Sequence, residues 1–207
     1  MINPGLIDMI MRLRGRGISD NAVLRAMELI DRRHFLDKKY WDAAYDEQSL
    51  PIACGQTLSK PLTVALMTQM LELKAENKVL EIGTGSGYHT AVLSKIVKRV
   101  YSVERYKKLI ADTEACFARI GITNHVIRHG DGRYGWKGQA PFDRIIFGCA
   151  IKKAPKKLME QVSEGGMLVA VSQNQLMRYC KTKDGFSSET LFPLSLPALE
   201  TGKSKTL

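Results

Sequence analysis

The 207-residue chain lacks any long apolar run, and this absence limits its class. No segment approaches the ~18 consecutive apolar residues of a membrane-spanning helix. The apolar stretch near the start is interrupted by Arg12, Arg14 and Arg16 and lacks a small-residue cleavage site, so we expect no secretory leader. Hydrophobic residues make up 44% and charged residues 25%, as in folded soluble domains. We therefore expect a cytoplasmic globular protein.

Paired cysteines and metal-ligand clusters are also absent from the sequence. Cys54, Cys116, Cys149 and Cys180 are far apart, and neither a CxxC pair nor a histidine cluster at metal-ligand spacing occurs. We expect reduced and mostly buried thiols, and no metal site.

Internal repeats and low-complexity segments are missing as well, which predicts one domain. Lys and Arg outnumber Asp and Glu by 31 to 21, giving a net charge of +10. Such a charge suits a nucleic-acid partner, but the basic residues are spread along the chain. The densest group, at residues 152–157, has the appearance of an exposed helix start. A solvated surface is the favoured interpretation.

The N-terminal part shows helix starts and stops. Asn3 followed by Pro4 predicts a helix that ends near Gly15, and Asp20 predicts the start of a second helix. Residues 49–61 contain turn-forming residues and are expected to be irregular.

From Pro61 onward, short apolar runs alternate with amphipathic segments, which is typical of a parallel sheet covered on both faces. We expect helices at residues 61–73, 88–97, 106–120 and 155–162, and strands at residues 79–83, 99–104, 125–130, 142–148 and 166–172. Two further strands, 176–181 and 188–194, flank Asp184 and Gly185, whose DG pair predicts an antiparallel hairpin.

The most informative motif is VLEIGTGSGYHTAVL, in which Gly83, Gly85 and Gly87 lie between a strand and a helix. Glycines there allow a sharp turn and the close approach of a ligand. One residue, Ser86, separates the last two glycines, whereas the dinucleotide fingerprint has two. Glu81 would repel a pyrophosphate but attract an ammonium group, so the pattern favours S-adenosylmethionine.

Two further acids follow strands of the expected sheet. Glu104 ends the strand at 99–104, where a carboxylate accepts hydrogen bonds from ribose hydroxyls. Asp131 and Gly132 follow the next strand and are expected at the adenine edge. Three successive strand ends thus offer contacts to one ligand.

The sequence resembles the protein-L-isoaspartate O-methyltransferase family. The resemblance rests on LPIACGQTLSKP, VALMTQMLEL, the glycine motif, VYSVER, GDGRYGW, APFDRII and GGMLVAV, which follow one another in the family's order over residues 7 to 172. It implies an α/β, Rossmann-like class I methyltransferase fold: a mostly parallel sheet with helices on both faces, a C-terminal antiparallel hairpin and an N-terminal helical cap. We expect one domain over 1–207, with cap and acceptor-site segment at 1–60, cofactor-binding core at 61–207, and a monomer.

The resemblance also implies roles for individual residues. Ser59 is the residue that the family marks as catalytic, and Thr57 lies with it at the acceptor site. The cofactor S-adenosylmethionine would contact the residues of the glycine loop and of two strand ends, namely Glu81, Gly83, Thr84, Gly85, Ser86, Gly87, Glu104, Arg105, Asp131 and Gly132.

The reaction that the resemblance implies is repair. Methylation of the free α-carboxylate of isoaspartate, in damaged proteins and peptides, forms an ester that collapses to a succinimide and can reopen to normal aspartate. Because such a carboxylate has a pKa of roughly 3.5, it is anionic at neutral pH and needs no general base. We therefore assign Ser59 the orientation of the acceptor and not covalent attack. His89 is expected to be exposed or to cap a helix, and Trp136 to anchor packing.

The chain departs from the family at two segments expected to face the substrate. Gly148–Ala150 has Cys149 where the family usually has alanine, and Ala170–Gln175 replaces a longer loop. These departures leave alternatives open. One is an RNA methyltransferase, although FGCAIKKAP stands where such enzymes often carry an Asn/Asp-Pro-Pro-aromatic motif. The others are a carboxyl methyltransferase of a peptide-maturation pathway and a cofactor-binding protein that has lost catalysis.

Overall fold

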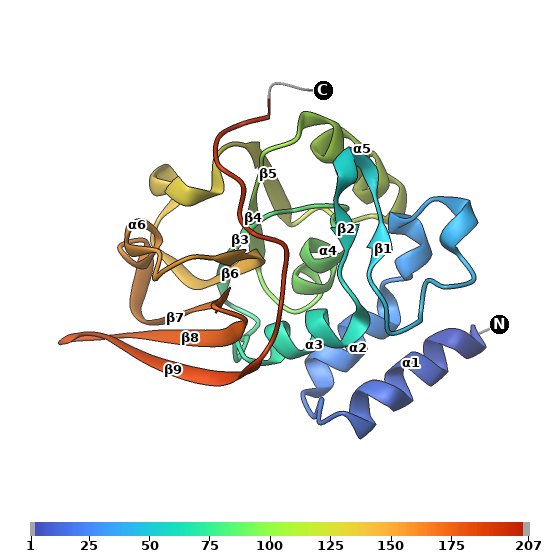
Figure 1. Ribbon diagram of the computed structural model, residues 1–207, viewed down its shortest axis with the longest axis horizontal. Coiled ribbons are helices and arrows are strands. Elements are labelled where there is room, and N and C mark those ends of the chain that lie inside the picture. The colour runs from blue at the N-terminus through green and yellow to red at the C-terminus, as the bar shows by residue number, and fades with distance from the viewer. Residues whose placement is uncertain (1–2, 205–207) are drawn as a thin grey trace.

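A seven-stranded sheet forms the centre of the computed structural model, which describes residues 3–204 (Figure 1). The spatial order is β5 (His125–His129), β4 (Arg99–Glu104), β3 (Lys78–Ile82), β6 (Phe142–Ile151), β7 (Val162–Ser172), β8 (Gln175–Thr182) and β9 (Gly185–Pro193). The first five of these strands pair in parallel, and β8 and β9 add an antiparallel edge. The Rossmann-like sheet with a C-terminal hairpin is confirmed.

Helices cover the two faces of the sheet unequally (Figure 1). The long helices α3 (Pro61–Gln69), α4 (Tyr88–Ser94) and α5 (Lys107–Ile120) lie on one face, and the opposite face carries α6 (Lys156–Met159), η4 (Gly132–Tyr134) and η5 (Lys137–Gln139). Strand alternation gives both faces apolar side chains on which helices pack, since successive side chains point to opposite faces. Val79 packs with Leu93 of α4, whereas Leu80 packs in the cluster that contains Leu158 of α6.

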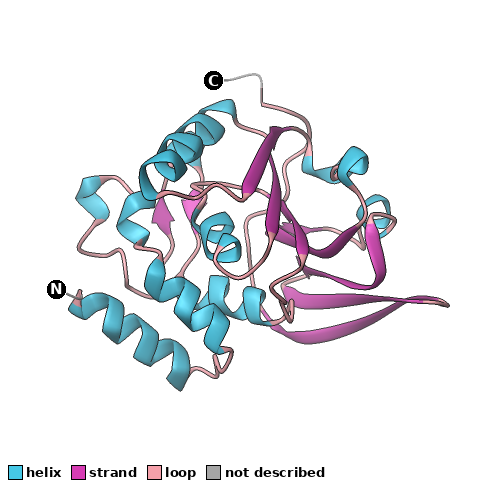
Figure 2. Cartoon of the chain, turned by 180° about the vertical axis from the view of Figure 1, so that it is seen from behind, coloured by secondary structure: helices cyan, strands magenta, loops and turns pink. Residues whose placement is uncertain are grey.

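The N-terminal cap contains α1 (Pro4–Gly15), α2 (Asn21–Leu29), η1 (Arg32–Phe35) and η2 (Lys38–Tyr40). The Asn3 side chain accepts a hydrogen bond from the N–H of Gly5, and Asp20 caps α2 in the same way, so both expected helix starts are confirmed. Apolar side chains of α1 and α2 share one buried cluster with those of α3, α4 and α5. Figure 2 shows these helices gathered on one side of the sheet.

Residues 50–58 differ from the irregular segment that we expected. They form a small hairpin of β1 (Leu50–Pro51) and β2 (Thr57–Leu58), joined by η3 (Ala53–Gly55). The turn is closed by the N–H of Ile52, which donates to the carbonyl of Gln56 at 2.9 Å. Strands of two residues are too short to show an alternation in the sequence, which is why the pattern missed them.

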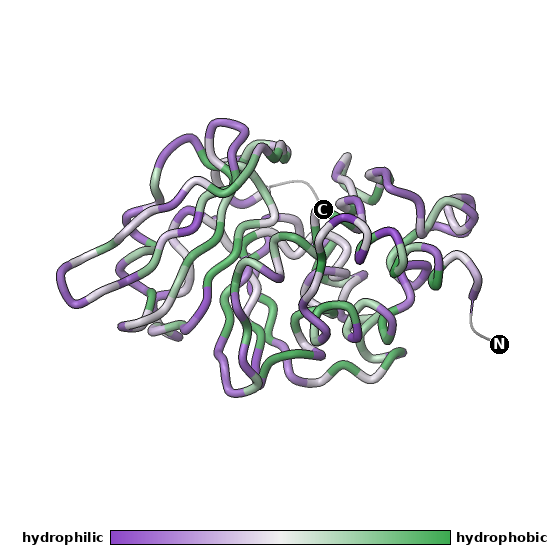
Figure 3. The backbone as a smooth tube through the Cα atoms, turned by 90° about the horizontal axis from the view of Figure 1, so that it is seen from below, coloured by the Kyte–Doolittle hydropathy of each residue, from purple (hydrophilic) through white to green (hydrophobic). Residues whose placement is uncertain are grey.

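The C-terminal half contains two more differences. The helix expected at 155–162 is a single turn, because β7 already begins at Val162. Ala170–Gln175 is no open loop: β7 runs to Ser172, and Gln173 and Asn174 form a tight turn with φ of 52° and 57° into β8. The β8–β9 hairpin turns at Lys183–Asp184 as predicted, and its outer end is hydrophilic (Figure 3).

Three element ends also shift by a few residues. The helices expected to reach 73 and 97 end at Gln69 and Ser94, and the strand expected to end at 148 continues to Ile151. Between residues 3 and 204, none of the helices combines the length and the apolar character required to cross a membrane.

Candidate active site

A pocket lies at the carboxyl ends of the central strands, where the order of the sheet reverses around β3. Ligands bind at this place in open α/β sheets. The pocket is lined by the β1–β2 hairpin (56–59), the loop after β3 (82–86), the end of β4 (103–106), Gly148 and Cys149 of β6, and a C-terminal segment (197–200). The structure therefore brings the predicted acceptor segment and the predicted glycine loop together.

The loop after β3 has the backbone conformation that its glycines allow. Gly83 and Gly85 have φ of 92° and 56°, in the left-handed region that favours glycine. Gly148 of the neighbouring strand is equally constrained, since a Cβ there would lie 2.9 Å from the carbonyl oxygen of Gly83. The loop thus presents bare backbone to the pocket, together with Thr84 and Ser86.

Glu104 lies in the pocket wall and is almost fully buried. Its Oε2 accepts the N–H of Gly85 at 2.9 Å, and its Oε1 accepts the N–H groups of Arg105 and Tyr106. A carboxylate has about four acceptor positions, so Oε2 retains one for a ligand hydroxyl. This geometry fits the ribose-binding role predicted for Glu104.

Glu81 does not reach the pocket, contrary to the interpretation that it attracts a ligand ammonium. It is fully buried beneath the loop, where its Oε2 accepts hydrogen bonds from the hydroxyls of Thr90 and Ser102. Ser102 also hydrogen-bonds to Thr84 at 2.6 Å. Burial raises the pKa of Glu81 to about 7. Glu81 therefore ties α4 to β4 under the glycine loop, and the pattern failed because it does not distinguish a pocket acid from a buried one.

Two other predicted cofactor residues lie outside the lining. Gly87 packs against α5, and a Cβ there would lie 2.5 Å from Cγ2 of Thr113, so this glycine serves close packing. Asp131 accepts hydrogen bonds from Nε and Nη2 of Arg133 and from the backbone N–H groups of Arg133 and Gly202. The hydrogen bonds from Arg133 lower its pKa to about 2. Gly132 does line the pocket.

Thr57 of β2 and Ser59, which directly follows β2, face the same pocket. The Ser59 side chain is half-buried, and within residues 3–204 its hydroxyl makes no hydrogen bond, so it is available to a ligand. The backbone of Ser59 is held in place by a hydrogen bond, because Nη2 of the buried Arg32 donates to the Ser59 carbonyl at 3.0 Å. The geometry supports an orienting hydroxyl on a rigid segment.

His89 is neither exposed nor a helix cap, so that expectation is wrong. The half-buried side chain lines the pocket, and its Nε2 lies 2.8 Å from Oγ1 of Thr68. Because Thr68 donates its own proton to the carbonyl of Val64, it must accept from His89, which assigns the ring proton to Nε2. Burial lowers the pKa of His89 to about 4, so the imidazole is neutral at pH 7.

Cys149 faces the pocket from β6, as a neighbour of Gly148. Burial raises the pKa of its thiol to about 12. The thiol is thus protonated at neutral pH and is a poor nucleophile.

Trp136 has the packing role expected for it, in edge contact with Tyr101 of β4 at 5.6 Å between ring centroids.

A C-terminal segment that the sequence pattern did not predict forms one wall of the pocket. Pro197–Glu200 crosses the end of β6, where the N–H of Leu199 donates to the carbonyl of Ala150 at 2.7 Å. Arg105 forms an ion pair with Glu200 and donates to the carbonyl of Gly202. Arg105 lines the pocket as predicted, but its guanidinium is held by this segment.

Metal-ligand clusters are absent from the described part of the chain, in which no three His, Cys, Asp or Glu side chains are grouped to hold an ion.

Comparison with known proteins agrees with this arrangement. The model of the family described as protein-L-isoaspartate(D-aspartate) O-methyltransferase matches residues 6–191. The chain belongs to this family. It is 44% identical over 209 residues to the protein-L-isoaspartate O-methyltransferase of Maricaulis maris, covering 99% of this chain and 98% of the relative. The Xanthobacter autotrophicus enzyme of the same name is 45% identical over 203 residues, covering 96% and 93%. Family membership makes this chain a methyltransferase.

Solved structures have the same fold. A protein-L-isoaspartate O-methyltransferase superposes with a TM-score of 0.86 at 25% identity, over 94% of this chain and 66% of the solved chain. This chain therefore spans slightly less than two thirds of that protein's length. A Plasmodium falciparum protein assigned to the same enzyme class, in complex with S-adenosyl-L-homocysteine, superposes with a TM-score of 0.81 at 24% identity, over 93% and 97% of the two chains.

Proposed function

We propose that this methyltransferase transfers a methyl group from S-adenosylmethionine to the free α-carboxylate of L-isoaspartyl residues in damaged proteins and peptides. The observation that carries the proposal is the meeting of two segments in one pocket. The Ser59 hairpin, the family's acceptor motif, faces the glycine loop and Glu104. Family membership and the 44% sequence identity to a near-full-length relative of that name support the same activity.

The pocket fits S-adenosylmethionine in two respects. The left-handed glycines at 83 and 85, with Gly148 against them, leave room for a ligand to lie on the backbone. Oε2 of Glu104 keeps an open acceptor position, which suits a ribose hydroxyl. When bound, the cofactor supplies an electrophilic methyl group on its sulfonium.

The residues of the chain orient the acceptor and avoid side reactions. The Ser59 hydroxyl donates to the isoaspartyl carboxylate, which is already anionic at neutral pH. Holding this group in line with the methyl lowers the barrier by several kcal/mol, without a general base. The neutral His89 and the protonated Cys149 add neither a competing charge nor a thiolate that would itself be methylated.

The test is transfer of labelled methyl to two short peptides that differ only in containing isoaspartate or normal aspartate. Base-labile label on the isoaspartyl peptide alone is the expected result. If neither peptide is labelled while S-adenosylhomocysteine still binds, the proposed acceptor is wrong. Label in RNA would instead favour the RNA methyltransferase.

We further propose one domain, with cap and acceptor segment at 1–60 and cofactor core at 61–207, acting as a cytoplasmic monomer. One buried apolar cluster containing residues of both parts supports a single folding unit. The four cysteines, all free thiols, suit a reducing compartment. Light scattering in solution tests the oligomeric state, and a dimer mass would contradict it.

A further inference from the structure

A group of four lysines follows the strand that carries Gly148 and Cys149 into the pocket, and it has no part in the chemistry above. Lys152 and Lys153 follow β6 directly, and Lys156 and Lys157 form α6; we call these four the lysine patch. All four side chains are exposed, and within residues 3–204 none forms an ion pair. Residues 151–157 contain no acid.

The path of β6 brings the start of the lysine patch, Lys152 and Lys153, close to the pocket. This strand carries Gly148 and Cys149 into the pocket and ends at Ile151. Lys152 follows Cys149 by three residues, a span of at most about 10 Å of extended chain. A polypeptide that presents a residue to Ser59 therefore extends its flanking residues into the field of these charges.

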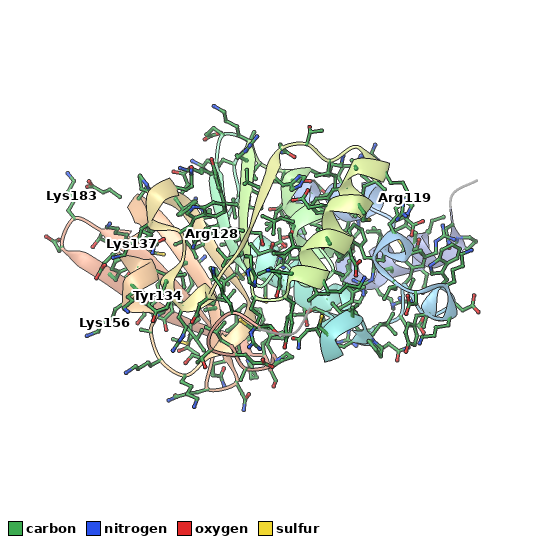
Figure 4. All side chains as sticks on the ribbon, turned by 90° about the horizontal axis from the view of Figure 1, so that it is seen from above. Arg119, Arg128, Tyr134, Lys137, Lys156 and Lys183 are labelled. Carbon is green, nitrogen blue, oxygen red and sulfur yellow. The ribbon has the colours of Figure 1, made fainter. Side chains whose placement is uncertain are left out.

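The surroundings favour an acidic polypeptide over a nucleic acid. Sequence-tolerant binding of single-stranded nucleic acid combines a basic groove with free aromatic faces on which bases stack. The exposed ring nearest the patch is Tyr134, and it is already in contact with cations, since Nζ of Lys157 lies 4.4 Å and the guanidinium of Arg133 5.5 Å from its centroid. Figure 4 shows Tyr134, Lys137 and Lys156 on the same side of the molecule, away from Arg119 on α5.

We infer that the lysine patch makes the enzyme select isoaspartyl segments whose neighbouring residues are acidic. This inference rests on the proposed function. Positive charges at the rim of a site attract anionic partners and repel cationic ones, chiefly through the rate of encounter and the orientation of the partner. Since the lysines are solvated, the preference is moderate and sensitive to salt.

The experiment compares three isoaspartyl peptides of equal length, flanked by Glu, Gln or Lys. At low salt, kcat/KM is expected to be roughly tenfold higher for the Glu-flanked than for the Lys-flanked peptide, as two exposed ion pairs allow. The difference should vanish near 1 M salt, where the screening length is about 3 Å. The double variant Lys152→Glu/Lys153→Glu should reverse the order of the two peptides.

A matched control is available at the amino ends of the strands, opposite to the carboxyl ends where the pocket lies. Lys95 and Lys98 are exposed, form no ion pair within the described residues, and lie between the end of α4 and the amino end of β4. Lys95→Glu/Lys98→Glu changes the net charge equally and should leave the preference unchanged. Equal loss of preference in both double variants, or no loss in either, would overturn the inference.

The Gln-flanked peptide separates this inference from the function on which it rests. If the wild-type enzyme does not methylate it, the proposed acceptor is wrong. If the enzyme methylates it and treats the Glu-flanked and Lys-flanked peptides alike, the lysine patch has no role in peptide choice. Label in an RNA oligonucleotide, with no charge preference among peptides, would assign the patch to nucleic acid and overturn the inference.

Discussion

Arg32 donates a hydrogen bond from Nη2 to the backbone carbonyl of Ser59, across 27 residues of sequence. The arginine side chain is fully buried, its Nε donates to the carbonyl of Ala44 at 2.6 Å, and its guanidinium lies 4.6 Å from the centroid of the Tyr88 ring. One cation thus holds together the N-terminal cap, the acceptor hairpin and the start of α4. The position of the Ser59 hydroxyl depends on this contact.

Replacing Arg32 by Met should remove the support of the Ser59 backbone. Loss of a hydrogen bond to a charged donor costs about 1.5–3 kcal/mol, so kcat/KM for an isoaspartyl peptide should fall roughly tenfold to a hundredfold. Cofactor affinity should change little, because Glu104 and the glycine loop keep their contacts. Steady-state kinetics and calorimetric titration with S-adenosylhomocysteine measure the two quantities.

The control for Arg32→Met is Arg25→Met, at an exposed arginine of α2. Arg32→Lys keeps the buried charge but cannot reach both carbonyls, and it should have an intermediate effect on kcat/KM. If a variant that folds as judged by its melting curve keeps full activity, Arg32 does not position Ser59.

Ser59→Ala should slow turnover by roughly tenfold to a thousandfold, the effect of removing one positioned donor worth about 1.5–4 kcal/mol. The affinity for S-adenosylhomocysteine should be nearly unchanged. Ser187→Ala, on the exposed β9, is the matched control. An equal loss of cofactor binding in Ser59→Ala would refute the orienting role.

Glu81→Gln should stabilise the protein at alkaline pH. The folded-state pKa of about 7 lies above the ordinary 4.5, so between these values the folded chain keeps a proton that the unfolded chain has lost. This group therefore reduces stability as pH rises from 4.5 to 7. The stability of the variant relative to wild type should increase by up to about 3 kcal/mol between pH 4.5 and pH 8, since one pKa unit corresponds to about 1.4 kcal/mol.

Urea unfolding of both proteins at several pH values measures this difference, and Glu164→Gln, at an exposed acid, is the control. A difference between Glu81→Gln and wild type that does not vary with pH would show that Glu81 is ionised throughout.

The stability of His89→Gln relative to wild type should increase toward acid pH, opposite to that of Glu81→Gln. The pKa of about 4 lies below the ordinary 6.5, so as pH falls through this range the unfolded chain takes up a proton that the folded chain does not. Wild type loses stability toward acid through this group, and the variant should not. The variant should gain up to about 3 kcal/mol relative to wild type between pH 7 and pH 4. Urea unfolding at several pH values measures the stability of both proteins, and His34→Gln, at an exposed histidine, is the control. A stability difference between His89→Gln and wild type that stays constant with pH would contradict the prediction.

The sequence allowed the cofactor half of the site to be predicted better than its other walls. Gly83, Gly85 and Glu104 follow directly after β3 or end β4, so their place at the carboxyl edge follows from the order of the elements. Position along a strand does not determine burial. Glu81 and Gly83 are two residues apart, yet one is sealed beneath the loop and the other lines the pocket.

The sequence pattern does not predict contacts between segments that are far apart in the chain. His89 pairs with Thr68 of another helix, and Asp131 accepts a hydrogen bond from Gly202, 71 residues away in the sequence. These pairs depend on tertiary packing, for which neither periodicity nor a local motif carries a signal.

The wall formed by residues 197–200 has a consequence for biosynthesis. All seven strands of the central sheet end by Pro193, so a growing chain contains the residues of the sheet, the glycine loop and Ser59 before it contains the last wall of the pocket. The last wall of the pocket is therefore synthesised after every strand of the sheet. A chain cut just after β9 would retain every strand of the sheet but lose the Arg105–Glu200 ion pair and the pocket wall at residues 197–200.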